Sequence, residues 1–281
     1  MKIIDVLSSA VKELKNANIE NNIYEARSFM AHILDKPVEW IMVHINDEIS
    51  GNDVLEFNKL IERRVLGEPF QYIIGSCGFM GQEFKVNKDV LVPRADTEVW
   101  VEKVIELAKK VQAKRILDLC TGSGCIAITL KKMLNDVVVY ASDISKEALE
   151  VACENAKQNG TDVNFICSDL FEKFSDDKFD IIVSNPPYIP REEIKKLACD
   201  VQNEPILALD GGVDGLDFYR KIVKESKNFI NENGYLVFEF GYDQVGQVKD
   251  ILKENDFNIC EIIKDYSGNT RAIISKKGDK E

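Results

Sequence analysis

The segment that most constrains the fold is Lys114–Gly124, where a short apolar run leads directly into a loop with two glycines. The segment reads KRILDLCTGSG, and a helical pattern begins at its end. Glycine adopts backbone angles that are closed to other residues, and it lets a ligand approach the main chain. A helix that starts at such a loop presents unpaired N–H groups to an anionic or polar ligand. The segment therefore predicts a strand, a ligand-binding turn and a helix.

Strand and helix patterns alternate along the chain after Pro93. Short apolar runs of strand type occur at 114–120, 137–142, 163–167, 179–184 and 235–240. Helical stretches separate most of them, at 123–134, 145–159 and 215–230, and a terminal antiparallel hairpin is suggested at 257–263 and 272–275. Such alternation predicts an α/β domain with a parallel sheet and helices on both faces.

The first 70 residues have a different pattern, because their apolar residues recur at helical spacing. We expect a bundle of about four short helices there. The stretch that follows is rich in glycine and aromatic residues, which favours a β-hairpin. A chain of 281 residues is long enough for two domains. We therefore divide it into a helical domain (1–70), a hairpin linker (71–92) and an α/β domain (93–281).

Charge and cysteine content argue against several classes of protein. The chain has 36 Lys and Arg against 48 Asp and Glu, a formal net charge of −12, whereas a nucleic-acid backbone requires a basic surface. The seven cysteines form no CxxC pair, and they favour free thiols in a reduced compartment over disulfides or a metal site. No apolar stretch is long enough to span a membrane, and the first residues do not resemble a secretory signal. We expect a cytoplasmic protein with no metal and no stable nucleic-acid partner.

The glycine loop alone leaves its ligand open, because residues 122–127 also fit the relaxed dinucleotide fingerprint GxGxxG/A. The next strand ends at Asp143, where a carboxylate is suited to accept hydrogen bonds from two ribose hydroxyls. Asp118 precedes the loop and favours a cationic ligand over a pyrophosphate. S-adenosylmethionine is such a ligand, since it has a sulfonium, an ammonium and a ribose but no phosphate. Asp169 and Leu170 end a third strand, where they could bind the amine and the ring of adenine.

The tetrapeptide Asn185-Pro186-Pro187-Tyr188 follows another predicted strand directly. Ligands of such sheets bind beyond the carboxyl ends of the strands, and the two prolines stiffen the backbone there. The Asn185 side-chain oxygen and the Pro186 carbonyl can each accept one hydrogen bond from a planar NH₂ group. This pair of acceptors aims the nitrogen at a methyl donor and stabilises the positive charge that develops on it. Tyr188 offers a flat face on which an amide or a base can stack.

Six motifs in this order give the chain a resemblance to the release factor glutamine methyltransferases, the PrmC/HemK family. The similar segments are GEPFQYIIG (67–75), VPRADTE (92–98), DLCTGSG (118–124), NPPYI (185–189), EPILALDGG with DGL (204–216) and DYSGNTR (265–271). The resemblance spans nearly the whole chain. It implies a helical substrate-recognition domain, a hairpin linker and a Rossmann-like, seven-stranded class I methyltransferase domain.

The resemblance also implies an activity and a set of site residues. The activity is transfer of a methyl group from S-adenosylmethionine to the side-chain amide nitrogen of the glutamine in the GGQ motif of class I peptide-chain release factors, which leaves S-adenosylhomocysteine. By position, cofactor binding falls to Cys120, Thr121, Gly122, Ser123, Gly124, Asp143, Leu170 and Asn185, and glutamine binding to Asn185, Pro186, Pro187 and Tyr188. Pro93 and Arg94 would lie near the substrate entrance.

Two positions depart from the family pattern. Cys120 replaces the first glycine of the loop, and we expect it to need ordinary backbone angles. Ala95 replaces a proline, which removes some stiffness at the entrance.

Three other functions stay open on the sequence alone. A methyltransferase acting on an exocyclic amine of a nucleic acid would use the same Asn-Pro-Pro-Tyr geometry, although the acidic balance disfavours it. A nicotinamide-dependent oxidoreductase would use the glycine loop but leave residues 185–188 unexplained. A non-catalytic interaction module would transfer no methyl group. We expect a monomer whose partners are class I release factors.

Overall fold

The computed structural model describes residues 1–278, which form two compact units. The first contains Met1–Gly75 together with Ala198–Asn203, which we call the returning segment. The second contains the rest of the described chain. The helical unit therefore runs past the predicted boundary at residue 70. It also includes a piece of chain that the sequence had placed in the α/β domain.

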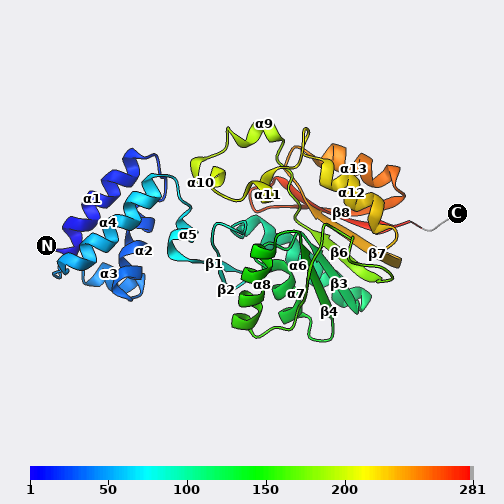
Figure 1. Cartoon of the computed structure of the whole chain (residues 1–281), viewed down its shortest axis with the longest axis horizontal. Helices are drawn as coiled ribbons and strands as arrows, with labels where there is room; N and C mark the ends of the chain where they lie inside the picture. The colour runs from blue at the N-terminus through cyan, green and yellow to red at the C-terminus, as the bar shows by residue number, and fades with distance from the viewer. Residues whose placement is uncertain (279–281) are drawn as a thin grey trace. The chain divides into compact units, whose positions relative to one another are not determined.

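The first unit is a bundle of helices (Figure 1). They are α1 (Ile3–Asn16), α2 (Asn22–Leu34), α3 (Val38–Val43), α4 (Gly51–Val65), α5 (Phe70–Ile74) and, in the returning segment, α10 (Cys199–Gln202). The helical stripe of α1 is buried as its spacing predicts, at Ile3, Val6, Leu7, Ala10 and Leu14. The expected helical bundle is confirmed.

The short helix α5 lies where the aromatic residues had suggested part of a hairpin. Pro69 stands at its N-cap, and Gly75 ends it in the left-handed conformation, with φ of 87°. Phe70 packs its ring against Phe29, with ring centroids 5.1 Å apart. The aromatic side chain thus contributes to the helical core, and residues 71–74 form a helix where the hairpin linker was predicted to begin.

A buried ion cluster holds the returning segment in the first unit. The Arg64 side chain is 9% exposed, and its guanidinium lies 2.7 Å from the Glu25 carboxylate and 3.3 Å from that of Asp200. A side chain at Gly67 would collide with Cys199, so glycine is required for this close approach. Removing one partner from a buried charge pair is strongly destabilising. The cluster therefore fixes where residues 198–203 lie within this unit.

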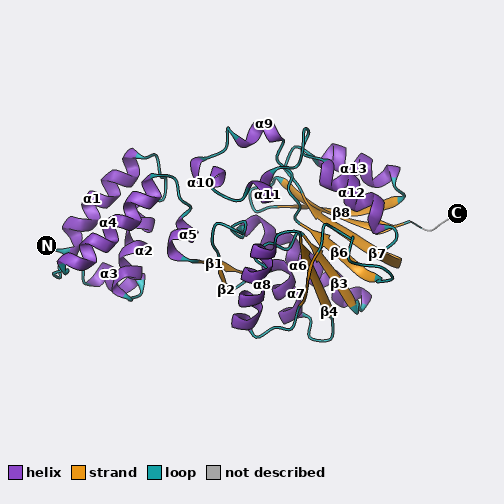
Figure 2. Ribbon diagram, viewed as in Figure 1, coloured by secondary structure: helices purple, strands orange, loops and turns teal. Residues whose placement is uncertain are grey.

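The second unit is built on a sheet of seven strands, counted over residues 1–278, in the order β5-β4-β3-β6-β7-β9-β8 (Figure 2). The strands are β3 (Arg115–Leu119), β4 (Val138–Asp143), β5 (Asn164–Cys167), β6 (Phe179–Ser184), β7 (Ile230–Glu239), β8 (Phe257–Lys264) and β9 (Thr270–Lys277). Strands β3 to β7 pair in parallel, and β9 runs antiparallel to both β7 and β8. The predicted seven-stranded α/β fold and its terminal hairpin are confirmed.

Helices bury both faces of this sheet because successive side chains of a strand point to opposite faces. On β3, Ile116 belongs to the core that packs against α6 (Ala95–Val111), α7 (Cys125–Met133) and α8 (Lys146–Asn159). Its neighbour Leu117 belongs to the opposite core, with α12 (Asp217–Ser226) and α13 (Val245–Glu254). Two-sided burial explains why the central strands read as continuous apolar runs.

Several elements of this unit were not predicted. They are the helices α6 and α13 and two short helices, α9 (Arg191–Ile194) and α11 (Ile206–Leu209). The predicted hairpin is present as β1 (Ser76–Phe79) and β2 (Gln82–Lys85), and its aromatic residues Phe79 and Phe84 are buried in the core with α6. The hairpin is therefore part of the second unit's core rather than a separate linker.

Candidate active site

Two loops that are distant in sequence begin side by side at one edge of the sheet. Strands β3 and β6 are parallel neighbours, and Leu119 pairs with Ser184 at their carboxyl ends. The Ser184 hydroxyl donates to the Leu119 carbonyl over 2.8 Å. The chain leaves β3 toward β4 and β5 and returns on the other side as β6, so this edge is a topological switch point, where such sheets bind ligands. The glycine loop follows β3 and Asn185 follows β6.

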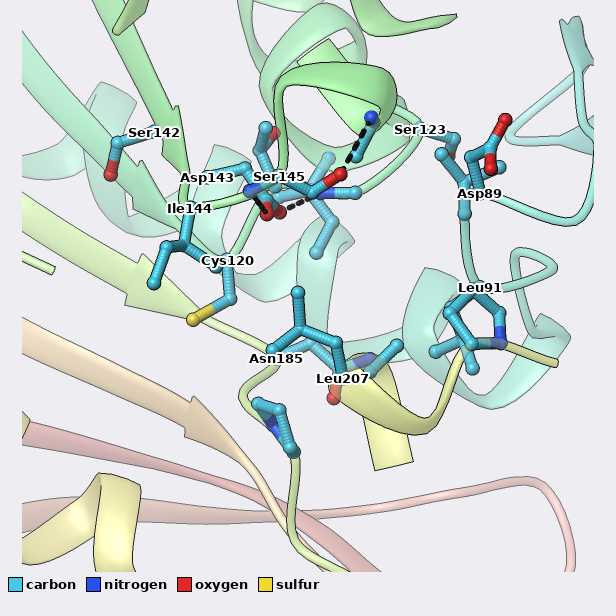
Figure 3. Close-up of a pocket in the computed structure, with 18 of the residues that line it drawn as sticks. Asp89, Leu91, Cys120, Ser123, Ser142, Asp143, Ile144, Ser145, Asn185 and Leu207 are labelled. Carbon is cyan, nitrogen blue, oxygen red and sulfur yellow. Dashed lines mark hydrogen bonds between the residues drawn. The ribbon is translucent and has the colours of Figure 1, made fainter. Parts of the chain in front are cut away.

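A cavity of about 340 Å³ opens at this edge, a size typical of a small-molecule site (Figure 3). Most of the predicted site residues line it, namely Cys120, Thr121, Gly122, Ser123, Asp143, Asp169, Leu170, Asn185 and Pro187. Gly124, Pro186 and Tyr188 are not among the lining residues. The structure thus places the glycine loop, both further strand ends and the start of the Asn-Pro-Pro-Tyr loop around one space.

The glycine loop adopts the left-handed conformation at three positions. Gly122 has φ of 53°, and Gly124 has φ of 79° where it caps helix α7. A side chain at Gly124 would lie 3.0 Å from the Ala152 methyl group, so its role is to let two helices approach. Cys120 also has a positive φ, 59°. The expectation of ordinary angles at Cys120 is therefore wrong: the cysteine keeps a conformation that favours glycine, at a cost in strain.

Asp143 braces the loop and still has capacity for a ligand. One carboxylate oxygen accepts from the Gly122 N–H over 2.9 Å, and the other accepts from the Ser145 N–H over 3.0 Å. A carboxylate has about four acceptor sites, so each oxygen retains one for a hydroxyl. Burial raises the pKa of Asp143 above its usual value, against the backbone hydrogen bonds that lower it.

The same contacts bear on the choice between cofactors. A diphosphate needs the loop N–H groups as donors, but Asp143 already takes the N–H of Gly122 and holds a carboxylate against the loop. Acidic side chains around the cavity include those of Asp89, Glu147 and Asp169. The carboxylate acceptors beside the loop therefore fit a cation with ribose hydroxyls better than a dinucleotide.

Asp118 does not act as the sequence suggested. Its side chain is completely buried and does not line the cavity. Burial raises its pKa to about 7, although the Thr121 hydroxyl donates to it over 2.6 Å and favours the charged form. Its second oxygen, Oδ1, has no hydrogen-bond partner. The predicted attraction of a cationic ligand by Asp118 is therefore not supported, and the residue orders the loop through Thr121.

Asn185 and Tyr188 play different parts in the geometry. Asn185 is half-buried and lines the cavity next to the glycine loop. The Tyr188 ring packs against the core on the side of α12 and α13. Burial raises the pKa of its phenol well above the usual value, so it stays neutral. The structure therefore does not bring Tyr188 to the cavity wall.

Sequence reasoning missed two walls of the cavity. One is the loop after the hairpin, residues 88–92, and the other comprises Pro205, Leu207 and Ala208 with Phe218 and Lys221. The buried Glu204 carboxylate joins the two sides, because it accepts from the Val92 N–H over 2.9 Å and pairs with Arg94. The motifs at 92–98 and 204–212 mark both ends of this link, but their spacing alone could not show that they meet.

Neither a membrane-spanning helix nor a metal-binding cluster is found among the residues that the structure describes. No helix within residues 1–278 is long and apolar enough to cross a bilayer. The same residues contain no group of three or more His, Cys, Asp or Glu side chains placed to hold a metal ion.

Known proteins resemble both units. A family model described as PrmC N-terminal domain matches residues 5–75, and one described as Methyltransferase small domain matches residues 97–203. The release factor glutamine methyltransferase of Thermodesulfovibrio yellowstonii is 39% identical over 282 residues, which cover 99% of each chain. That of Fusobacterium nucleatum is 40% identical over 284 residues, covering 99% of this chain and 79% of its own. A crystal structure of a methyltransferase from Pyrococcus furiosus shares the fold, with a TM-score of 0.54 at 20% identity over 72% of this chain and 92% of its own.

Proposed function

Because the chain belongs to the release factor glutamine methyltransferase family, we propose that it methylates the glutamine of the GGQ motif in class I peptide-chain release factors. The reaction forms a bond between a methyl carbon and the side-chain amide nitrogen. S-adenosylmethionine supplies that methyl group from its sulfonium. One proton leaves the amide nitrogen, and S-adenosylhomocysteine is the second product.

The proposed cofactor fits the residues that line the cavity. Asp143 would accept from the ribose hydroxyls at the two acceptor sites that Gly122 and Ser145 leave free. Leu170 is buried at the cavity wall and offers an apolar face for the adenine ring, with Asp169 beside it for the exocyclic amine. The loop from Cys120 to Gly124 would hold the methionine part against the start of α7.

Asn185 would orient the substrate amide. An amide nitrogen is a poor nucleophile because its lone pair is delocalised, so its direction and its developing charge must be set by fixed acceptors. The Asn185 side-chain oxygen and the Pro186 carbonyl would each accept one N–H of the glutamine. No strong base is required before transfer, since the nitrogen becomes acidic once it is alkylated. Asn185 would also lie within reach of the cofactor, because Asn185 and the glycine loop line the same cavity.

The observation that carries the proposal is the pairing of Leu119 with Ser184. It supports the proposal because Asn185, which would orient the amide, then follows β6 beside the loop that would hold the methyl donor. A nicotinamide-dependent enzyme would give the Asn-Pro-Pro-Tyr loop no part in its chemistry.

The decisive experiment measures transfer of a radiolabelled methyl group from S-adenosylmethionine to a purified class I release factor. A release factor whose GGQ glutamine is changed to glutamate is the control for the acceptor. We expect label on the first protein and none on the second. Label that persists on the control, or label only on a nucleic acid, would reject the proposal.

A variant of the enzyme tests the role of Asn185. Asn185→Ala should lower turnover about 10²-fold or more, by analogy with loss of one donor from an oxyanion hole. Cofactor affinity should fall less, because Asp143 and the glycine loop remain. Near-normal turnover in this variant would contradict the mechanism.

The proposal extends to partners and location. We propose a monomer that acts in the cytoplasm, where translation terminates, and that holds no nucleic acid stably. The net charge of −12 supports electrostatic attraction to a release-factor loop that must itself meet ribosomal RNA and is expected to be basic. Complex formation that is insensitive to salt would contradict this electrostatic contribution.

A further inference from the structure

The main chain of Tyr188 is enclosed by residues from two later parts of the chain. The Gln244 side-chain amide donates to the Tyr188 carbonyl over 2.9 Å. Its other end accepts from the Gly241 N–H over 3.0 Å, which fixes which atom of the amide is nitrogen. Gln244 is 6% exposed, so this bond is made in a dry environment where a lost partner is costly.

Gly211 and Gly215 pack against the main chain of Tyr188. A Cβ at Gly211 would lie 2.7 Å from the Tyr188 Cα and 2.8 Å from its carbonyl carbon. A Cβ at Gly215 would collide with the Tyr188 carbonyl oxygen. Real Cβ atoms do not approach backbone so closely, so neither position tolerates a side chain unless the tyrosine backbone moves.

The next residue continues this contact as a short parallel bridge. The Ile189 N–H donates to the Leu209 carbonyl over 3.0 Å, and the Gly211 N–H donates to the Ile189 carbonyl over 2.9 Å. The Asn-Pro-Pro-Tyr loop is therefore tied at its end to residues 209–211. Its start is tied to β6, which pairs with β3.

We propose that Gln244, Gly211 and Gly215 form a positioning brace, which sets the direction of the acceptors at Asn185 and Pro186. None of the three members of the brace lines the cavity, so the brace acts from outside it. It acts through Tyr188 on a loop whose two prolines transmit a displacement rather than absorb it. A misplacement of about 1 Å at a reacting group can lower a rate about 10²-fold. The inference rests on the proposed function for its catalytic consequence, but not for its geometry.

Two variants test the brace, each with a matched control on helix α13. Gln244→Met keeps the length of the side chain, but its thioether has no N–H to donate to the Tyr188 carbonyl. Its control is Gln247→Met, since Gln247 is exposed on helix α13. Gly211→Ala introduces only the Cβ that must displace Tyr188. Its control is Gly246→Ala, where a Cβ meets nothing within 4 Å.

We expect both brace variants to lower kcat about 10- to 100-fold while the dissociation constant of S-adenosylmethionine changes by less than about twofold. Both controls should behave as the unmodified protein. Unchanged kcat in the brace variants overturns the proposal. A loss of cofactor affinity that matches the loss of kcat also overturns it, because a general loss of structure would then explain both.

Hydrogen exchange separates this inference from the proposed function. In Gln244→Met, the Ile189 and Gly211 amides should exchange about tenfold faster or more, whereas amides within β3 should not change. Unchanged exchange at these two amides overturns the brace. If the unmodified protein transfers no methyl group to a release factor but the two amides respond as expected, the proposed function fails and the brace stands.

Discussion

Replacing Asp118 with asparagine should change how the stability of the second unit depends on pH. Asp118 is completely buried, its Oδ1 atom has no hydrogen-bond partner, and burial raises its pKa from 3.8 to about 7. Asparagine has nearly the same shape and still accepts from the Thr121 hydroxyl, but it has no proton to lose. The substitution therefore removes one ionisable group and leaves the packing around it nearly unchanged.

The sign and the size follow from linkage between folding and protonation. Between pH 3.8 and about 7 the folded protein keeps a proton on Asp118 that the unfolded chain has released. The folded state then binds more protons, so stability falls as pH rises, by about 1.4 kcal/mol for each pH unit. Above pH 7 the loss is complete and amounts to about 4 kcal/mol. From pH 5 to pH 8, Asp118→Asn should gain about 2 to 3 kcal/mol relative to the parent protein.

Urea denaturation from pH 5 to pH 8 measures this difference. The chain has two tryptophans, Trp40 in the helical unit and Trp100 buried in the second unit. Trp40→Phe in both proteins makes fluorescence report Trp100, so that unfolding of the second unit is followed alone. A difference in free energy of unfolding that stays constant within about 0.5 kcal/mol across this range would refute the argument that Asp118 is protonated in the folded protein.

Two further predictions concern the cofactor loop. Cys120→Gly should give a protein more stable than Cys120→Ala by about 1 kcal/mol, because alanine keeps the strain of a left-handed φ and glycine relieves it; equal midpoints of urea denaturation would show that the loop is not strained. Asp143→Ala should weaken the binding of S-adenosylmethionine about 10- to 100-fold in calorimetry, since it removes hydrogen bonds to a charged acceptor. Glu147→Gln, which also lines the cavity, is the control for a change of charge alone. Unchanged affinity in Asp143→Ala would contradict the proposal that Asp143 binds the ribose.

The parts of the fold that were predictable from sequence are those in which local pattern and long-range packing agree. Central strands such as β3 and β6 are buried on both faces, so their apolar runs stand out from any neighbouring segment. The stripe of α1 is equally clear, because one face of that helix meets the core. Helix α6 was not predicted, although its buried residues Trp100, Val104 and Ala108 follow helical spacing.

The site was predictable in its residues but not in its walls. Asp143 ends one strand and Asn185 follows another, and the carboxyl ends of parallel strands meet at one edge. The contact of Val92 and Arg94 with Glu204 joins positions 112 and 110 residues apart, which no local pattern specifies. The backbone angle of Cys120 was mispredicted for a related reason: the surrounding structure imposes it on the residue against local preference.

Because of the returning segment, the coding sequences of the two units are interleaved in the gene. The polypeptide passes between them at residues 75–76, 197–198 and 203–204, so no single break in the gene divides one unit from the other. A recombination event that exchanged only the first 75 residues would combine positions 64 and 67 of one parent with residues 199 and 200 of the other. These positions are in contact here, as Arg64 with Asp200 and Gly67 with Cys199. We therefore expect natural chimeras of this architecture to be rare, and changes in the packing of the helical unit to be accompanied by changes in residues 198–203.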